Sequence, residues 1–117
     1  MRQVEAAADR GEPDARLAID VYIHRLAGGI AAMSAATEGA DVLAFTGGVG
    51  EHSALVRRRA AGRLAYLGVA VDPGRNGAVS GDADITAAGA SVRTLVITAR
   101  EDLQIAGEAR RLLAGQR

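Results

Sequence analysis

The sequence predicts an α/β fold in which parallel strands are covered by helices. Two short, nearly all-apolar runs bounded by turn residues, "DVLAFT" (41–46) and "RTLVIT" (93–98), have the pattern of strands buried on both faces. Helical patterns precede and follow these runs, and such alternation is typical of parallel pairing. Hydrophobic residues make up 49% of the 117-residue chain but include only one Phe, two Tyr and no Trp, which suits aliphatic packing between helices and strands.

The first 40 residues are expected to form two helices. "RQVEAAADR" is a short one that ends at Gly11, and a long one begins near Pro13, which suits a first helical turn, and ends with Gly39 as its C′ residue. Spacings of four and three place one apolar stripe on the long helix: Ile19, Ile23, Leu26, Ile30 and Met33. Gly28 and Gly29 interrupt it at a cost of about 1 kcal/mol each relative to Ala, which predicts close packing against a neighbour.

The rest of the chain continues the alternation. After "TGGVGEHS" (46–53), Ser53 is expected to cap a helix that carries Val56, Ala60, Leu64 and Leu67 on one side and Arg57–Arg59 on a solvated face. "GVAVD" (68–72) is a brief extended segment, 73–84 is a turn-rich connection, and 99–115 is a closing helix. Two good strands leave unpaired sheet edges, so we expect the chain either to borrow strands from another subunit or to belong to a longer protein.

Composition excludes several classes of partner. Fourteen basic and fourteen acidic residues cancel, so there is no electrostatic case for a nucleic acid or an anionic membrane as partner. No run approaches the roughly 20 apolar residues of a membrane span, and the N-terminus has no signal-peptide pattern. With no cysteine, disulfides and thiolate metal sites are impossible. A cytoplasmic protein is the expectation.

The glycine-rich segment is the first candidate site. A glycine turn from the carboxyl end of a strand into a helix exposes backbone N–H groups at the edge where open α/β sheets bind ligands. It lacks the Lys-Ser/Thr of a phosphate-binding P-loop, and Ser53 occupies the third glycine position of the dinucleotide pattern. The spacing alone leaves open a nucleotide or phosphate site or a purely structural turn. His52 lies in this segment, but no acid or nucleophile partner for it is evident.

The second candidate is Glu101 in "TARED" (98–102), which follows the second strand. A carboxylate there reaches the same sheet edge, and Mg²⁺ is commonly held by one or two carboxylates together with water and phosphate. Thr98 and Glu101 also have the spacing of a capping box, which needs no ligand. Both interpretations remain open on the residues alone.

Taken together, the two segments point to a family. "DVLAFTGGVGEHSALVR", "LGVAVD", Asn76 and "VITAREDLQIA" occur in the order and spacing that resemble the C-terminal end of acetate kinases, the phosphotransferases that include propionate and butyrate kinases. The resemblance covers essentially all 117 residues. It implies a single partial domain (1–117), an incomplete C-terminal lobe of the actin-like, Hsp70-like and sugar-kinase-like (ribonuclease H-like) ATPase fold.

The same resemblance implies cofactors and site residues. ATP or ADP would lie against the glycine segment and the first two residues, whose "MR" resembles the end of a family D-[MF]-R motif, and the glutamate associated with Mg²⁺ matches Glu101. The implied nucleotide-binding residues are Met1, Arg2, Gly47, Gly48, Val49, Gly50, Glu51 and His52. His52 stands where the family usually has Asn, a departure that alters a ribose or adenine contact.

The implied reaction is ATP plus acetate giving ADP plus acetyl phosphate, with a short-chain carboxylate or acyl phosphate as the second substrate. No catalytic residue of the family matches a position in these 117 residues, so we expect the chain alone to be inactive. A homodimer, or a complex with a missing N-terminal half, is the expected assembly. The alternatives are a noncatalytic binding or assembly module and a degenerate remnant that does not fold stably.

Overall fold

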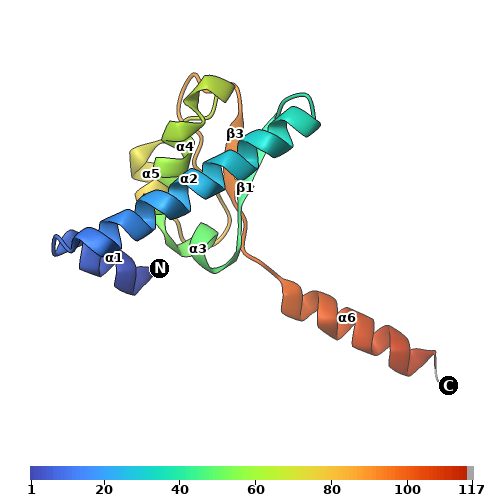
Figure 1. The fold of residues 1–117 in the computed structure, drawn as a ribbon. Coiled ribbons are helices and arrows are strands. Elements are labelled where there is room, and N and C mark those ends of the chain that lie inside the picture. The colour runs from blue at the N-terminus through green and yellow to red at the C-terminus, as the bar shows by residue number, and fades with distance from the viewer. Residues whose placement is uncertain (116–117) are drawn as a thin grey trace.

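The structure is a computed structural model, and it describes residues 1–115. A small sheet lies beside the helices that precede it in the chain, and the last helix extends away from both (Figure 1). In chain order the elements are α1 (Arg2–Asp9), α2 (Pro13–Ala36), β1 (Val42–Phe45), α3 (Gly47–His52), α4 (Ala54–Arg63), η1 (Ala65–Leu67), α5 (Pro73–Gly77), β2 (Ala83–Asp84), β3 (Arg93–Val96) and α6 (Glu101–Ala114).

The sheet has the order β1-β3-β2 and is mixed. β1 and β3, the two predicted strands, are parallel, with Phe45 opposite Val96. β2 is antiparallel to β3, so the prediction that all strands of the sheet are parallel is wrong. β2 lies within the segment that was expected to be a turn-rich connection. The short loop between β2 and β3 explains the direction, because only antiparallel neighbours can be joined without a long crossover.

α2 supplies most of the core contacts of the N-terminal part. Ile19 and Ile23 are buried against Val56 of α4, and Ala27 packs in a second cluster with Leu64. The first half of the predicted apolar stripe is therefore confirmed. Its last member, Met33, is 63% exposed, because α2 continues beyond the elements that cover its first half (Figure 1).

The second half of α2 and the outer side of β1 form an open apolar groove. A Cβ added to Gly28 or Gly29 would meet no atom within 4 Å, so the predicted close packing at these glycines is wrong within residues 1–115. Gly29 instead lines the groove, which has a volume of about 630 Å³ and reaches Leu43 of β1. Val42 of β1 is 51% exposed, so the prediction of a strand buried on both faces is also wrong for β1.

The C-terminus of α2 ends one residue earlier than predicted. Glu38, with φ of +58°, is the left-handed C′ residue, and Gly39 follows it as C″. The N–H of Glu38 donates to Ala35 (3.3 Å) and that of Gly39 to Ser34 (2.8 Å), the two bonds of a Schellman motif. The predicted helix stop is right, but a glutamate occupies the position that glycine usually takes.

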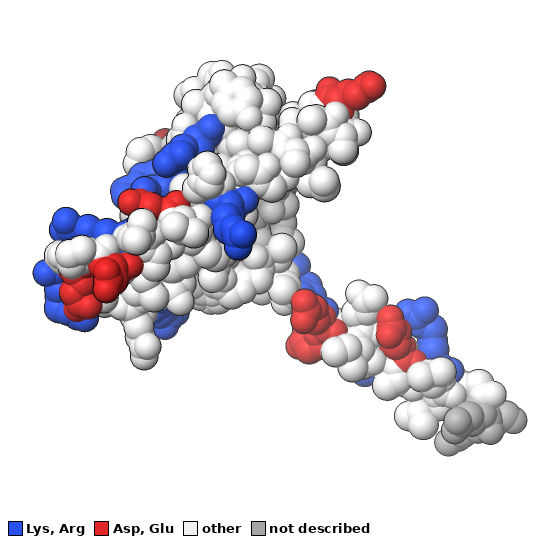
Figure 2. All heavy atoms as spheres, in the orientation of Figure 1, with Lys and Arg blue, Asp and Glu red and all other residues white. Residues whose placement is uncertain are grey.

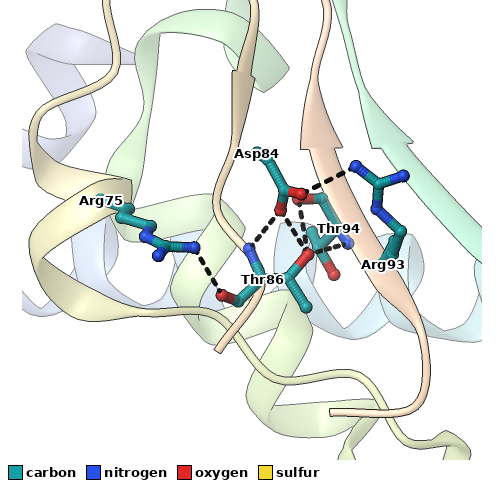
Figure 3. A network of polar contacts seen from close by, with 5 residues as sticks. All are labelled: Arg75, Asp84, Thr86, Arg93 and Thr94. Carbon is teal, nitrogen blue, oxygen red and sulfur yellow. Dashed lines mark hydrogen bonds and ion pairs between the residues drawn. The ribbon is translucent and has the colours of Figure 1, made fainter. Parts of the chain in front are cut away.

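The β2–β3 pair is tied by a polar network at its edge (Figure 3). The carboxylate of Asp84 accepts hydrogen bonds from the backbone and hydroxyl of Thr86 (3.0 and 2.5 Å) and pairs with Arg93 (2.9 Å). Thr86 Oγ1 also accepts from the N–H of Thr94 (2.8 Å). These bonds, the contacts with Thr86 first, hold the pKa of Asp84 far below its ordinary value.

α6 has no buried residue and extends away from the rest of the molecule (Figure 1). Its large apolar side chains are 65–72% exposed: Leu103, Ile105, Leu112 and Leu113. Charges of both signs lie along it and over α1, whereas the second half of α2 carries few charges before its acidic tip (Figure 2). Among the described helices, none is long and apolar enough to cross a bilayer.

Candidate functional site

A cavity of about 370 Å³ lies between the start of the chain and the glycine segment. Its lining residues are Met1, Arg2, Glu5, Gly48, Val49, His52 and Ser53. Five of these seven are among the residues that the sequence implied for nucleotide binding. Two segments that are far apart in the chain therefore contribute to one cavity, whose size is near the lower end of the range for ligand pockets.

Glu5 and Ser53 were not predicted as site residues. Ser53 is 4% exposed, and its hydroxyl donates to the Glu5 carboxylate while it accepts the N–H of Val56 (3.1 Å). The second bond confirms Ser53 as the N-cap of α4. The first joins α1 to α4 at the cavity wall. Glu5 follows Met1 by one helical turn, so its place on the same face of α1 was available from spacing.

The three glycines of the segment differ in whether the chain itself requires glycine. Gly47 has φ of +73°, a conformation that favours glycine. A Cβ at Gly50 would lie 3.2 Å from the carbonyl carbon of Phe45, so Gly50 allows close packing within the chain. A Cβ at Gly48 would meet no atom of residues 1–115 within 4 Å, and Gly48 alone of the three lines the cavity. At Gly48, therefore, neither backbone conformation nor packing within residues 1–115 requires glycine.

The segment folds as a helix of its own, α3, in place of a simple turn before α4. Four of its carbonyl groups, those of residues 48–51, have partners: Gly48 O contacts Nδ1 of His52 (2.9 Å), and Val49 O accepts the N–H of Ser53 (2.9 Å). The carbonyls of Gly50 and Glu51 accept hydrogen bonds from Nη1 of Arg57, at 2.8 and 2.9 Å. Such groups at helix ends need partners from outside the helix.

Arg57 is buried, so the prediction of a solvated Arg57–Arg59 face is wrong for its first member. Its side chain is 2% exposed, and its other nitrogens donate to Asn76, Nε to Oδ1 (2.7 Å) and Nη2 to the carbonyl (2.8 Å). Asn76 Nδ2 in turn donates to Ala54 O (2.9 Å). Burial lowers the pKa of Arg57.

The other two arginines differ from Arg57. Arg58 is exposed as predicted, and Arg59 pairs with Asp20 on α2 (2.6 Å). Helical spacing could have indicated this difference, because Arg57 precedes Ala60 by three residues and Leu64 by seven and so lies nearer the apolar side of α4 than Arg58 or Arg59.

Glu51 binds within the chain and does not line the cavity. Its Oε1 accepts the N–H of Gly47 (2.9 Å) and the N–H of Ala99 (2.8 Å). The carboxylate therefore ties the beginning of α3 to the segment that leads from β3 into α6. The implied nucleotide contacts in residues 47–51 therefore fall into two groups. Gly48 and Val49 line the cavity, whereas the shape of the segment depends on Gly47, Gly50 and Glu51, whose contacts are with other residues of the chain.

Glu101 begins α6 and is exposed. Because β1 and β3 are parallel and in register, the glycine segment and the approach to Glu101 leave the same edge of the sheet, as predicted. Glu101 does not line the cavity, however, and lies by a shallow depression with Gln104, Ile105 and Glu108. In residues 1–115 no group of three or more metal-ligating side chains occurs.

The capping box predicted for Thr98 and Glu101 does not form. The N-cap of α6 is Arg100, without a side-chain capping bond. Asp82 instead accepts the N–H of Thr98 (2.8 Å) and pairs with Arg100 (2.8 Å), and these contacts lower the pKa of Asp82. The Glu101 carboxylate is thus left without the structural role that competed with metal binding.

Comparison with known proteins extends these observations. A family model described as the acetokinase family matches residues 1–107. The chain is 50% identical to the acetate kinase of Gloeobacter violaceus over 108 residues, 92% of this chain and 27% of that protein. Its structure is similar to Porphyromonas gingivalis acetate kinase (TM-score 0.85, 31% identity, 96% of this chain, 28% of that one) and to a propionate kinase from Francisella tularensis (TM-score 0.81, 33% identity, 89% and 26%).

The chain therefore spans less than a third of the length of each of these relatives. The structural likeness confirms the predicted fold class, an α/β part of the kinase fold, with the correction that the small sheet is mixed.

Proposed function

Because the chain belongs to the acetokinase family, we propose that it is the nucleotide-binding C-terminal part of a phosphotransferase acting between ATP and a short-chain carboxylate, in the first place acetate. The observation that carries the proposal is the cavity to which Met1 and Arg2 contribute together with Gly48, Val49 and His52. In its favour, no contact within residues 1–115 explains the absence of a side chain at Gly48.

The cavity lining fits the adenosine part of ATP or ADP. Met1 and Val49 offer apolar surface to a purine ring, and the carboxylate of Glu5 is an acceptor suited to ribose hydroxyls. Arg2 supplies positive charge for a phosphate. In phosphoryl transfer, positioning and charge neutralisation supply most of the catalysis, so binding of this kind is a substantial contribution.

Glu101 fits Mg²⁺ only as one ligand among several. A single exposed carboxylate does not hold this ion tightly, but Mg²⁺ is commonly bound by one or two carboxylates with nucleotide phosphates and water. We therefore propose that Glu101 contacts Mg²⁺ that arrives with the nucleotide. Bound there, the ion would neutralise phosphate charge, and Glu101 would orient it.

The proposal is tested by calorimetric titration of the 117-residue chain with ADP and with GDP, each with and without Mg²⁺. We expect saturable binding of ADP and no acetate-dependent formation of ADP from ATP by this chain alone, because no catalytic residue of the family is matched in it. Absence of ADP binding at millimolar concentration from a folded sample contradicts the proposed nucleotide site. Robust turnover contradicts the proposal that this chain binds the nucleotide but lacks the catalytic residues.

A second candidate function, an assembly module, is favoured by the open apolar groove beside β1. Its proposed occupant is the remainder of a kinase-length polypeptide, since the chain spans only 27% of its Gloeobacter relative. Co-expression with the part of that relative that precedes the match distinguishes the cases: restored kinase activity supports complementation, and binding without activity supports a noncatalytic module. A homodimer is a third outcome, seen as a doubled mass. A chain without a cooperative thermal transition is a degenerate remnant.

For a complemented kinase we propose a cytoplasmic location.

A further inference from the structure

We propose that Arg57 is a positioning residue that holds α3 in place, and with it the wall of the nucleotide cavity, from outside the cavity. The inference rests on the proposed function for its ligand, but its geometry is independent of any ligand. Arg57 lines no part of the cavity and is 2% exposed. Its neighbours Arg58 and Arg59 are less buried, in keeping with their positions farther from the apolar side of α4.

Two of the four hydrogen bonds of Arg57 are made to the C-terminal end of α3, and the other two to Asn76. One nitrogen, Nη1, donates to the carbonyls of both Gly50 and Glu51. A positive charge at the C-terminal carbonyls of a helix is favourable, and it satisfies groups that would otherwise be buried without partners. Within residues 1–115, Arg57 forms no ion pair with a carboxylate, so its hydrogen bonds are directed to an amide side chain and to backbone carbonyls.

α3 needs such support because it is six residues long and contains three glycines. Helices of that length are not stable on their own, and each interior glycine lowers stability further. Glu51 holds the opposite end through the N–H of Gly47. The exposed wall residue Gly48 thus lies between two sets of hydrogen bonds, from the Glu51 carboxylate at the beginning of α3 and from the Arg57 guanidinium near its end, and His52 directly follows the second set.

Asn76 in α5 orients the guanidinium. It is 3% exposed and accepts two hydrogen bonds from Arg57, one at its side-chain oxygen and one at its carbonyl. Asp72 caps α5 through the N–H of Arg75 (2.8 Å), which fixes the turn that presents Asn76. The 72–77 turn, which lines no part of the cavity, is therefore coupled to nucleotide binding through one side chain.

The experiment compares Arg57→Lys with Arg58→Lys, the same chemical change on an exposed neighbour. Lysine keeps the charge but has no planar fork that can reach Asn76 and both carbonyls together. For each variant, hydrogen exchange by NMR is measured at the N–H groups of Gly47 and Ala99, with Val92 N–H, bonded to Gly68 O at 3.1 Å, as the distant reference. Affinity for ADP is measured by calorimetry on samples shown to be folded.

We expect Arg57→Lys to accelerate exchange at Gly47 and Ala99 by about tenfold relative to Val92. In the variant α3 can open locally without breaking the hydrogen bonds of the Arg57 guanidinium. Its Kd for ADP rises by about tenfold, whereas Arg58→Lys stays within about twofold of the wild type in both measurements. Asn76→Ala, which keeps the Nη1 bonds, has a smaller effect of the same kind.

Two results overturn the proposal: unchanged exchange and affinity in Arg57→Lys, or equal acceleration at all three amides, which makes Arg57 a general stabiliser. If the wild type itself binds no ADP, the proposed function fails, and the exchange comparison alone decides whether Arg57 holds α3.

Discussion

In the corner where α4 meets α3, the side chains of Val56, Arg57 and Leu64 are 1–2% exposed, whereas the leucines and isoleucine of α6 are 65–72% exposed. Both regions have helical sequence patterns with apolar residues at regular spacing. They differ in what surrounds them: α2, α5 and η1 contact α4, and in residues 1–115 nothing buries a side chain of α6. An amphipathic pattern therefore predicts that a helix has a face to bury, but not that the same chain supplies the partner.

The difference is measured most directly by one substitution made in both regions. Leu64→Ala removes a fully buried side chain and is expected to lower the free energy of unfolding by about 2–5 kcal/mol. Leu112→Ala, at a 72% exposed position of α6, is expected to change it by less than about 0.5 kcal/mol. Urea denaturation followed by circular dichroism checks both. Equal losses would mean that α6 is packed in solution against the body of the protein or another molecule.

Within the α3–α4 corner, substitution of two glycines distinguishes a role in packing from a role in ligand binding. Gly50→Ala is expected to cost about 1–3 kcal/mol of stability, because its Cβ would press on the backbone of Phe45. Gly48→Ala meets open space, so we expect stability to rise by up to about 1 kcal/mol, as for Gly to Ala within a helix, while ADP affinity falls. Denaturation and calorimetry on the same samples test the pair. Unchanged ADP binding in Gly48→Ala argues against a ligand at this wall.

At the start of α6, Glu101→Gln tests whether this outlying helix serves the site at all. We expect the affinity for ADP to fall by about tenfold in the presence of Mg²⁺, the loss of one charged contact, and to stay unchanged in EDTA. Glu108→Gln, two turns further along the exposed helix, is the control. Equal affinity for ADP with Mg²⁺ in the wild type and Glu101→Gln would leave the metal role without support.

The smallest effect concerns Asp84 at the sheet edge. Because its folded pKa is depressed below the value of about 4 in unfolded chains, its contribution to stability is present above pH 4 and is lost as the pH falls further. Asp84→Asn is expected to lower stability slightly at pH 7 and to flatten the decline of stability below pH 4, with Asp102→Asn as the control on α6. Thermal melts at pH 7, 4 and 3 reveal the difference, and parallel pH profiles contradict it.

Much of the fold was predictable because its signals are local. Pro13 in the first turn of α2, Ser53 as the cap of α4 and the two apolar runs of β1 and β3 each act within a few residues, and each is present as predicted. β2 was missed because two residues between turns carry no periodicity, and their strand character depends on pairing with β3. The capping box at Thr98 was wrong because Asp82, sixteen residues earlier in the chain, binds the same backbone N–H.

The candidate site likewise contains residues that the sequence indicated and residues whose role depends on tertiary contacts. The residues implied by resemblance include five that meet in one cavity, which the order of the motifs along the chain could suggest but not demonstrate. Asn76 and the two backbone bonds of Glu51 had no local signal. Helical spacing places Arg57 beside the apolar side of α4, but a triple of arginines ordinarily faces solvent. Burial of one member depends on the carbonyl groups that α3 directs toward α4, and those exist only once the helices have packed.

The sequence by itself determined where the four longer helices (α1, α2, α4 and α6) and the two longer strands lie, and that the glycine segment and the approach to Glu101 leave the same edge of a parallel pair. These properties follow from periodicity, capping and strand direction. The tertiary structure alone decided which glycine faces the cavity, which groups the buried Arg57 binds and which apolar faces remain open. Such outcomes depend on contacts between residues distant in the chain, and no local preference of a side chain contains that information.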